Sequence, residues 1–189
     1  ILDITWRARL SEHMGSVQVD VIKSYPEILD SRLTLAGAAA LSSMLLTFVE
    51  DRDPQPQMFD ATKKLYDLLI HPDIWCVGYF YWELALLEAL GFGLDLSKCV
   101  VTGDTENLLY LSPKSGCAVS QRAAGEWADR LLPMPRIVIG KDKHISDVFD
   151  GLQVLSSFWL NKVIPALGVT TMPKARERFI DIMQRHTVV

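Results

Sequence analysis

The sequence predicts a mainly α-helical protein, in which a β-hairpin precedes a bundle of about six helices. Apolar residues recur at three- and four-residue intervals in several segments after residue 27, whereas apolar and polar residues alternate in residues 1–24. Apolar residues make up 49 % of the 189 residues and charged residues 22 %. This composition supports a sizeable core and argues against disorder.

Residues 1–24 have the alternating pattern of two β-strands that are joined by residues 11–15. The apolar positions of this pattern are Ile4, Trp6, Ala8, Leu10, Val17, Val19 and Val21. A lone hairpin is only marginally stable in water, and the sequence begins with Ile1 rather than Met, so we expect further strands upstream. Tyr25-Pro26 interrupts the alternation and predicts a boundary between two domains, 1–26 and 27–189.

The first helix is predicted to extend to about Val49, because Asp30 or Ser31 can cap its N-terminus. The segment from Leu33 to Val49 contains no charged residue. It is shorter than the ~20 residues that span a bilayer, and it includes hydroxyl side chains. We therefore predict a buried helix rather than a membrane span. Its small residues between positions 35 and 40 should let neighbouring helices approach closely.

The stretch from Tyr79 to Cys99 begins in the most hydrophobic helix of the chain. Its apolar residues form two stripes, Trp75, Tyr79, Trp82, Leu86 and Leu90 on one, and Cys76, Phe80, Leu84 and Leu87 on the other. Only two glutamates carry charge, so other helices must surround this helix. Pro72 can begin it, Gly91 can end it in a left-handed conformation, and Gly93 then loosens the next turn.

The other segments predict four more helices and one irregular loop. A helix at residues 57–70 should point inward the side chains of Met58, Phe59, Thr62, Leu65, Tyr66 and Leu69. After the central helix we expect an irregular loop at 97–120, with strand-like pieces at 99–102 and 108–111, and then a helix at 120–132. A long helix should follow, which Ser146 caps and which Pro165 and Gly168 end. The last helix should extend from Pro173 to about His186.

Short motifs occur in several parts of the chain. Within the stretch from Tyr79 to Cys99 these are a glutamate after an aromatic residue, a Leu-Leu pair, Leu-Gly-aromatic-Gly, Asp-Leu-Ser and a cysteine. The others are WRARL at 6–10, SPKSG at 112–116, RLLP at 130–133 and PKARERF at 173–179. Together, and in their order along the chain, they give the chain a resemblance to RecO, the bacterial recombination mediator. It implies that residues 1–26 are the last strands of an N-terminal OB-fold, a five-stranded barrel that binds single-stranded nucleic acid. Most of that barrel would be missing from this sequence.

The resemblance also implies a function without catalytic turnover. RecO proteins act in the bacterial cytoplasm at the nucleoid, bind single- and double-stranded DNA, and anneal strands coated with single-strand-binding protein (SSB). They bind the acidic and hydrophobic tail of SSB and work with RecR to load RecA. The formal net charge of −4 does not by itself indicate a nucleic-acid-binding protein. A DNA role therefore needs basic residues gathered on one face.

The resemblance also raises the question of a zinc site, because many RecO-like proteins carry four cysteines in two pairs. The first pair begins at the position of Cys99, and the other ligand positions correspond here to Thr102, Ser120 and about Ala123. Structural zinc sites require four thiolate or imidazole ligands, so we expect no metal and a degenerate zinc-finger-like loop at 97–120. The chain contains three cysteines, a number that fits a reducing compartment and makes a disulfide framework improbable.

Glu83 is an ionisable residue in an apolar helix, where a charge is unfavourable unless it is paired. It could be a general base, or a structural carboxylate that accepts hydrogen bonds from an arginine or from amides near Gly91 and Gly93. No second carboxylate, Ser-His pair or activated cysteine accompanies it, so the structural role is favoured and the chain is not expected to be an enzyme. We predict structural roles for Glu83, Gly91, Gly93 and Cys99.

Two groups of basic residues are candidates for binding. Arg7 and Arg9 share one strand face and Lys23 lies on the partner strand, so this face could follow a phosphate backbone; the alternative is an ordinary solvated hairpin. Arg122, Arg130 and Arg136 surround an apolar segment that contains Trp127, and we predict that these four residues form the groove for a partner peptide.

The last helix also has a predicted basic side, made of Lys174, Arg176, Arg178 and Arg185. An apolar groove rimmed by arginine suits an acidic, hydrophobic peptide such as the SSB tail. The alternative for any one of these residues is an exposed charge on a helix. The alternative for the whole chain is a helical ligand-sensing or dimerisation domain with an apolar pocket.

Overall fold

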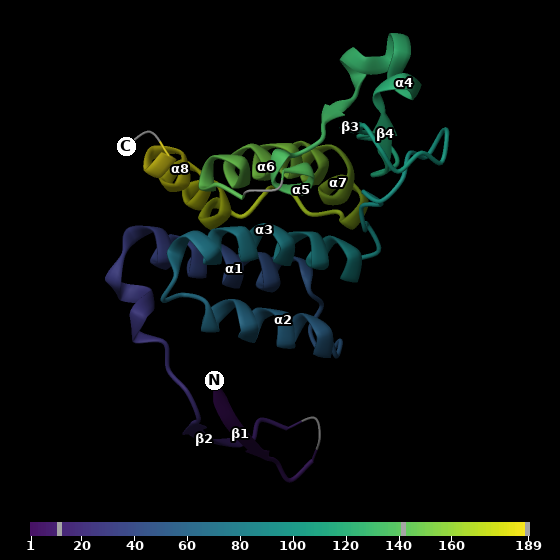
Figure 1. Ribbon diagram of the computed structural model, residues 1–189. Coiled ribbons are helices and arrows are strands. Elements are labelled where there is room, and N and C mark those ends of the chain that lie inside the picture. Colours follow the sequence, from purple (N-terminus) through teal and green to yellow (C-terminus); the bar gives the residue numbers. More distant parts are fainter. Residues whose placement is uncertain (11–12, 141–142, 188–189) are drawn as a thin grey trace.

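The computed structural model describes residues 1–10, 13–140 and 143–187, and it confirms a mainly helical protein with an N-terminal β-hairpin (Figure 1). The longer helices are α1 (Arg32–Phe48), α2 (Pro56–Asp67), α3 (Pro72–Ala89), α6 (Ile145–Phe158) and α8 (Lys174–Thr187). The shorter helical segments are η1 (Pro26–Asp30), α4 (Gln121–Ala124), η2 (Gly125–Arg130), α5 (Arg136–Ile139), η3 (Trp159–Val163) and α7 (Ile164–Leu167). The strands are β1 (Leu2–Arg7), β2 (Ser16–Val21), β3 (Leu108–Leu111), β4 (Ala118–Ser120) and β5 (Leu132–Pro133).

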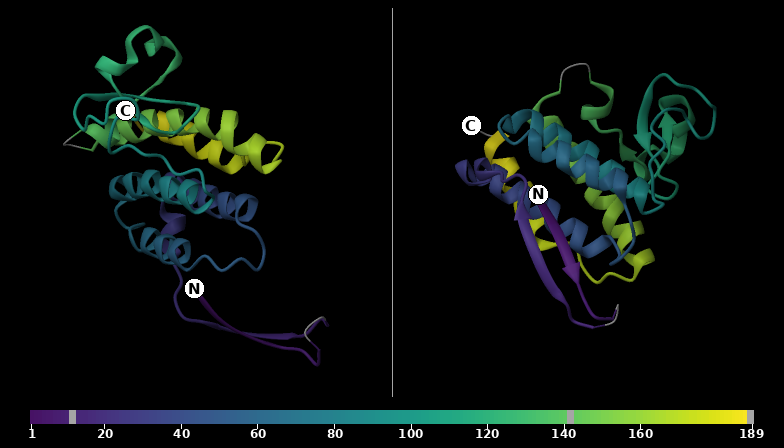
Figure 2. Two further views of the ribbon diagram at one scale, coloured as in Figure 1. Left: turned by 90° about the vertical axis from the view of Figure 1, so that its right-hand side faces the viewer. Right: turned by 90° about the horizontal axis from the view of Figure 1, so that it is seen from below.

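The helices form layers, with the hairpin and a small lobe at opposite ends of the molecule (Figures 1 and 2). One layer contains α6 and α8, the next contains α1 and α3, and α2 lies on the far side of that second layer. The small lobe is built on a three-stranded sheet with the order β4-β3-β5. The hairpin pairs β1 with β2 only, and it projects from the end of the molecule that lies beyond α2.

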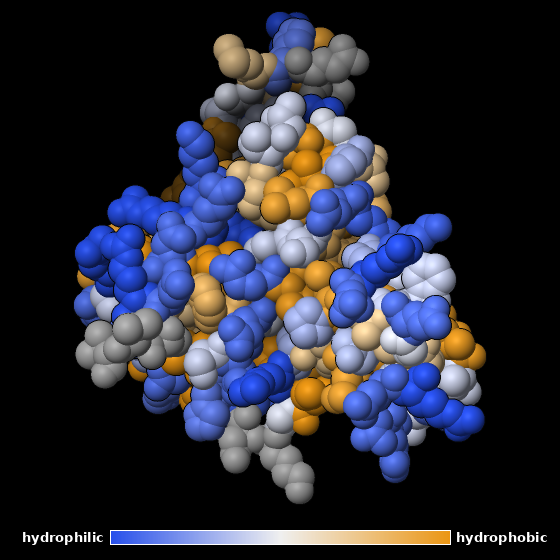
Figure 3. Space-filling model, turned by 90° about the horizontal axis from the view of Figure 1, so that it is seen from above, coloured by the Kyte–Doolittle hydropathy of each residue, from blue (hydrophilic) through white to orange (hydrophobic). Residues whose placement is uncertain are grey.

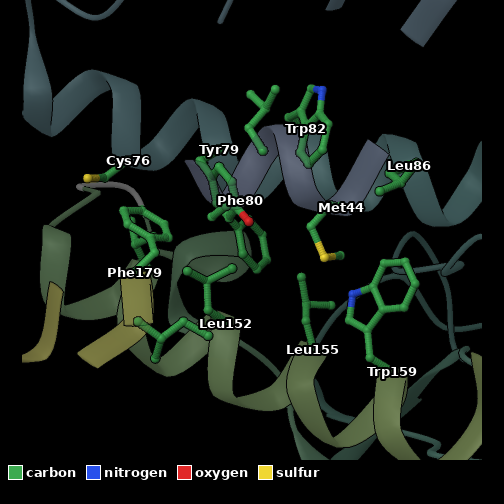
Figure 4. Packing of buried hydrophobic residues seen from close by; sticks show 14 of the residues in the cluster. Met44, Cys76, Tyr79, Phe80, Trp82, Leu86, Leu152, Leu155, Trp159 and Phe179 are labelled. Carbon is green, nitrogen blue, oxygen red and sulfur yellow. The ribbon is translucent and has the colours of Figure 1, made fainter. Parts of the chain in front are cut away.

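The central helix α3 is surrounded by other helices, as predicted. Trp82 and Leu86 are buried, and their neighbours on the helix pack against α6, α8 and α1 (Figure 4). Pro72 occupies the first turn, where its missing N–H has no partner to lose. Gly91 ends the helix with a φ of 81°, the left-handed conformation that glycine adopts at little cost.

Helix α1 begins at a Ser31 cap, whose hydroxyl accepts a hydrogen bond from the N–H of Thr34 at 3.1 Å. Its small residues allow the predicted close packing, because a Cβ on Gly37 would lie 2.2 Å from the ring of Trp75. The predicted burial holds for only part of the helix surface. One side packs against α3 and α8, whereas Leu46 on another side is 86 % exposed.

Two predictions about local structure are wrong. Phe59 was expected in the core, but it is exposed on α2, whereas Met58 and Leu65 of the same helix are buried in the core. Residues 99–102 form a turn rather than a strand, and their backbone closes on itself through a 2.8 Å hydrogen bond from the N–H of Gly103 to the carbonyl of Cys99.

The helix predicted at 120–132 is divided by Gly125. Its ψ of −128° is incompatible with a helix, so α4 stops and η2 begins there. The long helix starts at Ile145, with the Asp147 carboxylate accepting a hydrogen bond from the N–H of His144 rather than with a Ser146 cap. Pro165 does not end it, because a wide π-turn upstream bonds the N–H of Ile164 to the carbonyl of residue 159 and accommodates the ring.

The hairpin has the predicted alternation and an antiparallel register. The pairs Leu2–Val21, Ile4–Val19 and Trp6–Val17 place apolar residues together on one face, and all of them are exposed. The connection predicted at 11–15 lies partly outside the described residues. Within the part of the chain that the structure describes, no helix combines the length and apolar character needed to cross a membrane.

Candidate functional site

Arg7, Arg9 and Lys23, the predicted DNA-binding residues, do not come together on one face. Arg7 ends β1 opposite Ser16, and Arg9 follows in a bend beyond the strand. Lys23 lies past the other end of the hairpin, where its N–H donates a hydrogen bond to the carbonyl of Ile1 at 3.2 Å. A strand rises about 3.3 Å per residue, so roughly 20–23 Å separates Lys23 from Arg7.

Lys23 instead connects the hairpin to α2. Its ammonium group forms an ion pair with Asp67 at 2.5 Å, and the hydroxyl of Tyr25 donates a hydrogen bond to the same carboxylate at 3.0 Å. The hydrogen bond between the two charged groups raises the pKa of Lys23 and lowers the pKa of Asp67. Both groups are exposed, so the contact adds little stability. The ion pair does, however, neutralise the ammonium group of Lys23, which was predicted to bind DNA.

Trp127 and the arginines near it belong to the small lobe. Trp127 is 61 % exposed, and the guanidinium of Arg130 lies 5.0 Å from its ring centroid in a cation–π contact. Arg122 lines a polar hollow together with residues 103–107, and Arg136 begins α5. Seen from the side of this lobe, hydrophobic residues reach the surface between hydrophilic ones (Figure 3). The structure therefore pairs Trp127 with Arg130 and places Arg122 at a separate hollow.

An apolar groove with a basic rim lies between α1 and α8. It has a volume of about 330 Å³, and its lining is Arg32, Leu35, Ala36, Ala39, Lys174, Ala175, Arg178 and Ile182. The floor is formed by aliphatic side chains, and the charged groups in this lining are all cationic. The groove adjoins a second hollow, which shares Arg32 and Ile182 and adds Arg185. We call the two hollows together the α1–α8 groove.

The α1–α8 groove combines residues that the sequence suggested with residues that it did not. Lys174, Arg178 and Arg185 belong to the predicted basic side of the last helix. Arg176 was expected beside them, but it is buried with 1 % of its surface exposed. Arg32 was missed; the signal that could have identified it is its position as the only charged residue of a helix whose other residues are all uncharged.

Glu83 accepts hydrogen bonds from Arg176 inside the bundle. The Nη2 and Nε atoms of Arg176 lie 2.6 Å and 3.0 Å from the two carboxylate oxygens, and Trp159 Nε1 donates a third bond at 2.7 Å. Arg176 Nη1 also donates to the Ser156 hydroxyl at 2.8 Å. Burial alone would lower the pKa of Arg176, but the carboxylate of Glu83 raises it above its ordinary value.

This cluster links helices that are far apart in sequence, because its members come from α3, α6, η3 and α8. The carboxylate of Glu83 is fully buried and its oxygens are occupied by these donors. A general base needs a free lone pair and access to a substrate proton. The geometry is therefore that of a structural ion pair. Of the two partners that the sequence left open, an arginine or the amides near Gly91 and Gly93, the structure shows an arginine, Arg176.

Cys99 is buried in the small lobe, and its sulfur accepts a hydrogen bond from the N–H of Ser120 at 3.3 Å. Ser120 in turn caps α4 through the N–H of Ala123 at 3.4 Å. The structure thus brings together Cys99 and Ser120, two of the positions that the resemblance aligned with zinc ligands. One thiol with hydroxyl and methyl neighbours does not fit a zinc ion, which requires four thiolate or imidazole ligands. Among the residues that the structure describes, no cluster of three or more His, Cys, Asp or Glu could hold a metal.

The ionisation of the Cys99 thiol is expected to make the free energy of unfolding depend on pH. Burial would raise the pKa of this thiol, but hydrogen bonds from Ser120 and Thr102 outweigh burial and lower the pKa to about 6, from 9.0. Between pH 6 and pH 9 the thiol is protonated in the unfolded state and ionised in the folded state. The free energy of unfolding should therefore rise with pH by up to about 1.4 kcal/mol per pH unit, and this contribution should be lost as the pH falls through about 6. Urea unfolding across this range measures the slope.

A Cys99→Ser variant is the control for this titration, and it should show a flatter dependence on pH. Cys76 provides an internal contrast, because burial raises its pKa to about 12 and the thiol stays protonated throughout the range. Equal slopes for the variant and the wild type would contradict the assignment to Cys99.

Gly91 and Gly93 differ in whether the structure could accept a side chain at their position. At Gly91 the positive φ disfavours any side chain. Gly93 is not left-handed, and a Cβ there would make ordinary 3.5 Å contacts with Glu88. Nothing around Gly93 demands a glycine.

The sequence model of the family described as "Recombination protein O C terminal" matches residues 29–146, which is more than half of the chain. The chain belongs to the RecO family. Similar RecO proteins occur in Ruegeria sp. (strain TM1040), with 44 % identity over 97 % of this chain and 77 % of the relative, and in Jannaschia sp. (strain CCS1), with 42 % identity over 99 % and 77 %. Both relatives are named DNA repair protein RecO. These RecO matches extend over the hairpin and over α8, beyond the residues that the family model covers.

Proposed function

We propose that this protein is a non-enzymatic recombination mediator in bacterial DNA repair. It binds single- and double-stranded DNA and the C-terminal tail of SSB, anneals complementary strands, and with RecR assists the loading of RecA at the nucleoid. Membership of the RecO family and the names of its relatives support a DNA repair role. They favour it over the alternative of a helical ligand-sensing domain.

The observation that carries the proposal is the α1–α8 groove. Apolar side chains of the tail would pack on Leu35, Ala36 and Ile182, and its acidic groups would pair with the cations of the rim. Arg178 and Lys174 lie one turn apart on α8, a spacing that presents both charges to the same ligand. The resulting contact combines apolar burial with charge pairing, as in other grooves that bind amphipathic peptides.

Replacing Arg178 with glutamate is expected to weaken binding of a fluorescent SSB-tail peptide by about 10- to 100-fold, since a hydrogen bond to a charged group contributes about 1.5–3 kcal/mol. Fluorescence anisotropy measures the affinity. The matched control is Arg130→Glu beside Trp127, which should bind like the wild type. A loss of affinity in Arg130→Glu alone would place the tail at the small lobe, with Arg122, Trp127 and Arg136. Failure of the wild type to bind the peptide would contradict the proposal.

The hairpin arginines are proposed to contact DNA. An Arg7→Ala/Arg9→Ala double variant should lower the slope of log affinity against log salt by about one to two, because each phosphate contact contributes roughly 0.7–0.9. Titration of a labelled single-stranded oligonucleotide at several salt concentrations measures this slope. Lys23→Gln is the comparison, and it should change the slope less because Lys23 is paired with Asp67. An unchanged slope in the double variant would exclude the hairpin as a DNA-binding surface.

A further inference from the structure

One face of α1 is exposed, yet it carries no charge. Leu35, Ala39, Ser42 and Leu46 are spaced four, three and four residues apart, so they form one stripe along the helix. Leu35 is 48 % exposed and Leu46 86 % exposed. Single exposed leucines are common. An uncharged stripe that runs the length of a helix of 17 residues, about 25 Å, is unusual for a solvent-facing surface.

The two ends of this stripe are bordered by opposite charges. At the N-terminal end of α1, Arg32 lies with the cations of α8 on the rim of the α1–α8 groove. At the C-terminal end, Leu46 lines another hollow, of about 340 Å³ and separate from the α1–α8 groove, between α1 and α2, where Glu50 and Asp51 outnumber the single cation Arg52. Phe59, which is 61 % exposed, extends the apolar surface at that end.

We propose that two copies of this chain associate through the stripe, with their α1 helices antiparallel about a two-fold axis. The sequence positions are self-complementary around the midpoint between residues 40 and 41. Leu35 then faces Leu46 of the partner subunit, and Ala39 faces Ser42 of the partner subunit. The two small residues at the centre let the helices approach, and the leucines on either side fill the contact.

The charges match in the same arrangement. Antiparallel pairing brings the Arg32 end of each helix to the Glu50 and Asp51 end of the other, so both ends gain opposite charges. Such an interface is isologous, meaning that one patch serves both subunits and the contact closes on itself. A parallel arrangement would instead place cations against cations and is disfavoured.

This dimer would regulate the groove assigned to the SSB tail, a consequence that rests on the proposed function. Leu35 and Ala39 belong both to the stripe and to the lining of the α1–α8 groove. A partner helix on the stripe covers that lining, so tail binding and dimerisation exclude each other. The tail peptide should therefore shift the protein from dimer to monomer.

Sedimentation velocity over a range of micromolar concentrations, without peptide, tests the dimer. Wild-type protein should show a concentration-dependent dimer, and Leu46→Arg should raise the dimer dissociation constant at least tenfold. Arg32→Glu and Glu50→Arg should each weaken the dimer, whereas the two changes in one chain should restore it, because each interface end then regains a pair of opposite charges. The matched control is Val101→Arg, which alters another exposed apolar residue, 68 % exposed, in the small lobe.

Three results would overturn the proposal. The first is a wild-type protein that remains monomeric at every concentration. The second is a dimer that Leu46→Arg leaves intact but Val19→Lys abolishes, which would place the contact on the hairpin. The third is a failure of the charge swap to restore association. The dimer is measured without peptide, so a protein that dimerises but does not bind the tail would contradict the proposed function and not this inference.

Discussion

Replacing Arg176 with methionine is expected to destabilise the fold by about 3–5 kcal/mol, because it leaves the buried carboxylate of Glu83 without its cation. Methionine fills much of the same volume, so the loss reflects charge rather than a cavity. The Trp159 N–H and whatever water enters cannot replace the hydrogen bonds that the guanidinium donates to Glu83. Urea unfolding followed by circular dichroism measures the loss of free energy.

The matched control for Arg176→Met is Arg178→Met, two residues along the same helix. Arg178 is exposed on the rim of the α1–α8 groove, so this change should alter stability by less than about 0.5 kcal/mol. A double variant, Glu83→Leu with Arg176→Met, should recover much of the loss, since it removes both charges from the interior. Equal stabilities for the two methionine variants would contradict the role assigned to the ion pair.

Replacing Gly37 with valine is expected to destabilise the protein by about 3 kcal/mol, near the upper end of the cost of overpacking a core. A Cβ at this position would lie 2.2 Å and 2.3 Å from two ring carbons of Trp75, and 3.2 Å from Phe179. Both aromatic residues are fully buried and pack edge to face at 5.7 Å, so neither can move aside freely. The shift of the thermal unfolding midpoint measures the effect.

Ala39→Val provides the control for Gly37→Val. It introduces the same β-branched side chain two residues later on α1, on the exposed side of the helix. Its expected cost is the difference in helix propensity, roughly 0.5 kcal/mol. A Trp75→Leu background should reduce the effect of Gly37→Val, because it removes the ring that the valine would strike. If Gly37→Val costs no more than Ala39→Val, α1 is not packed against α3 as described.

The sequence predicted those parts of the fold in which local pattern and tertiary packing agree. The two strands of the hairpin follow from alternation, and α3 is apolar on so many sides that only a surrounded position suits it. The caps at Ser31 and Gly91 follow from local backbone chemistry. Each of these features depends on residues within a few positions of one another.

The sequence failed where distant contacts decide the outcome. The pattern shows that Glu83 needs a partner, but only the packing of α8 on α6 selects Arg176 over the other arginines. Phe59 has the right spacing for the core, yet within the described part of the chain it stays 61 % exposed. The proposed tail site depends on the meeting of α1 with α8, and spacing within α8 alone could not reveal Arg32.

The buried pair also has a consequence for how the chain is made. Arg176 follows Glu83 by 93 residues and belongs to the last helix. During translation, Glu83 therefore leaves the ribosome long before its cation is synthesised. Until α8 emerges, the nascent bundle must keep this acid hydrated or protonated, so the native core can close only when synthesis reaches α8. Chains that stop early would expose an unfinished interior to proteases.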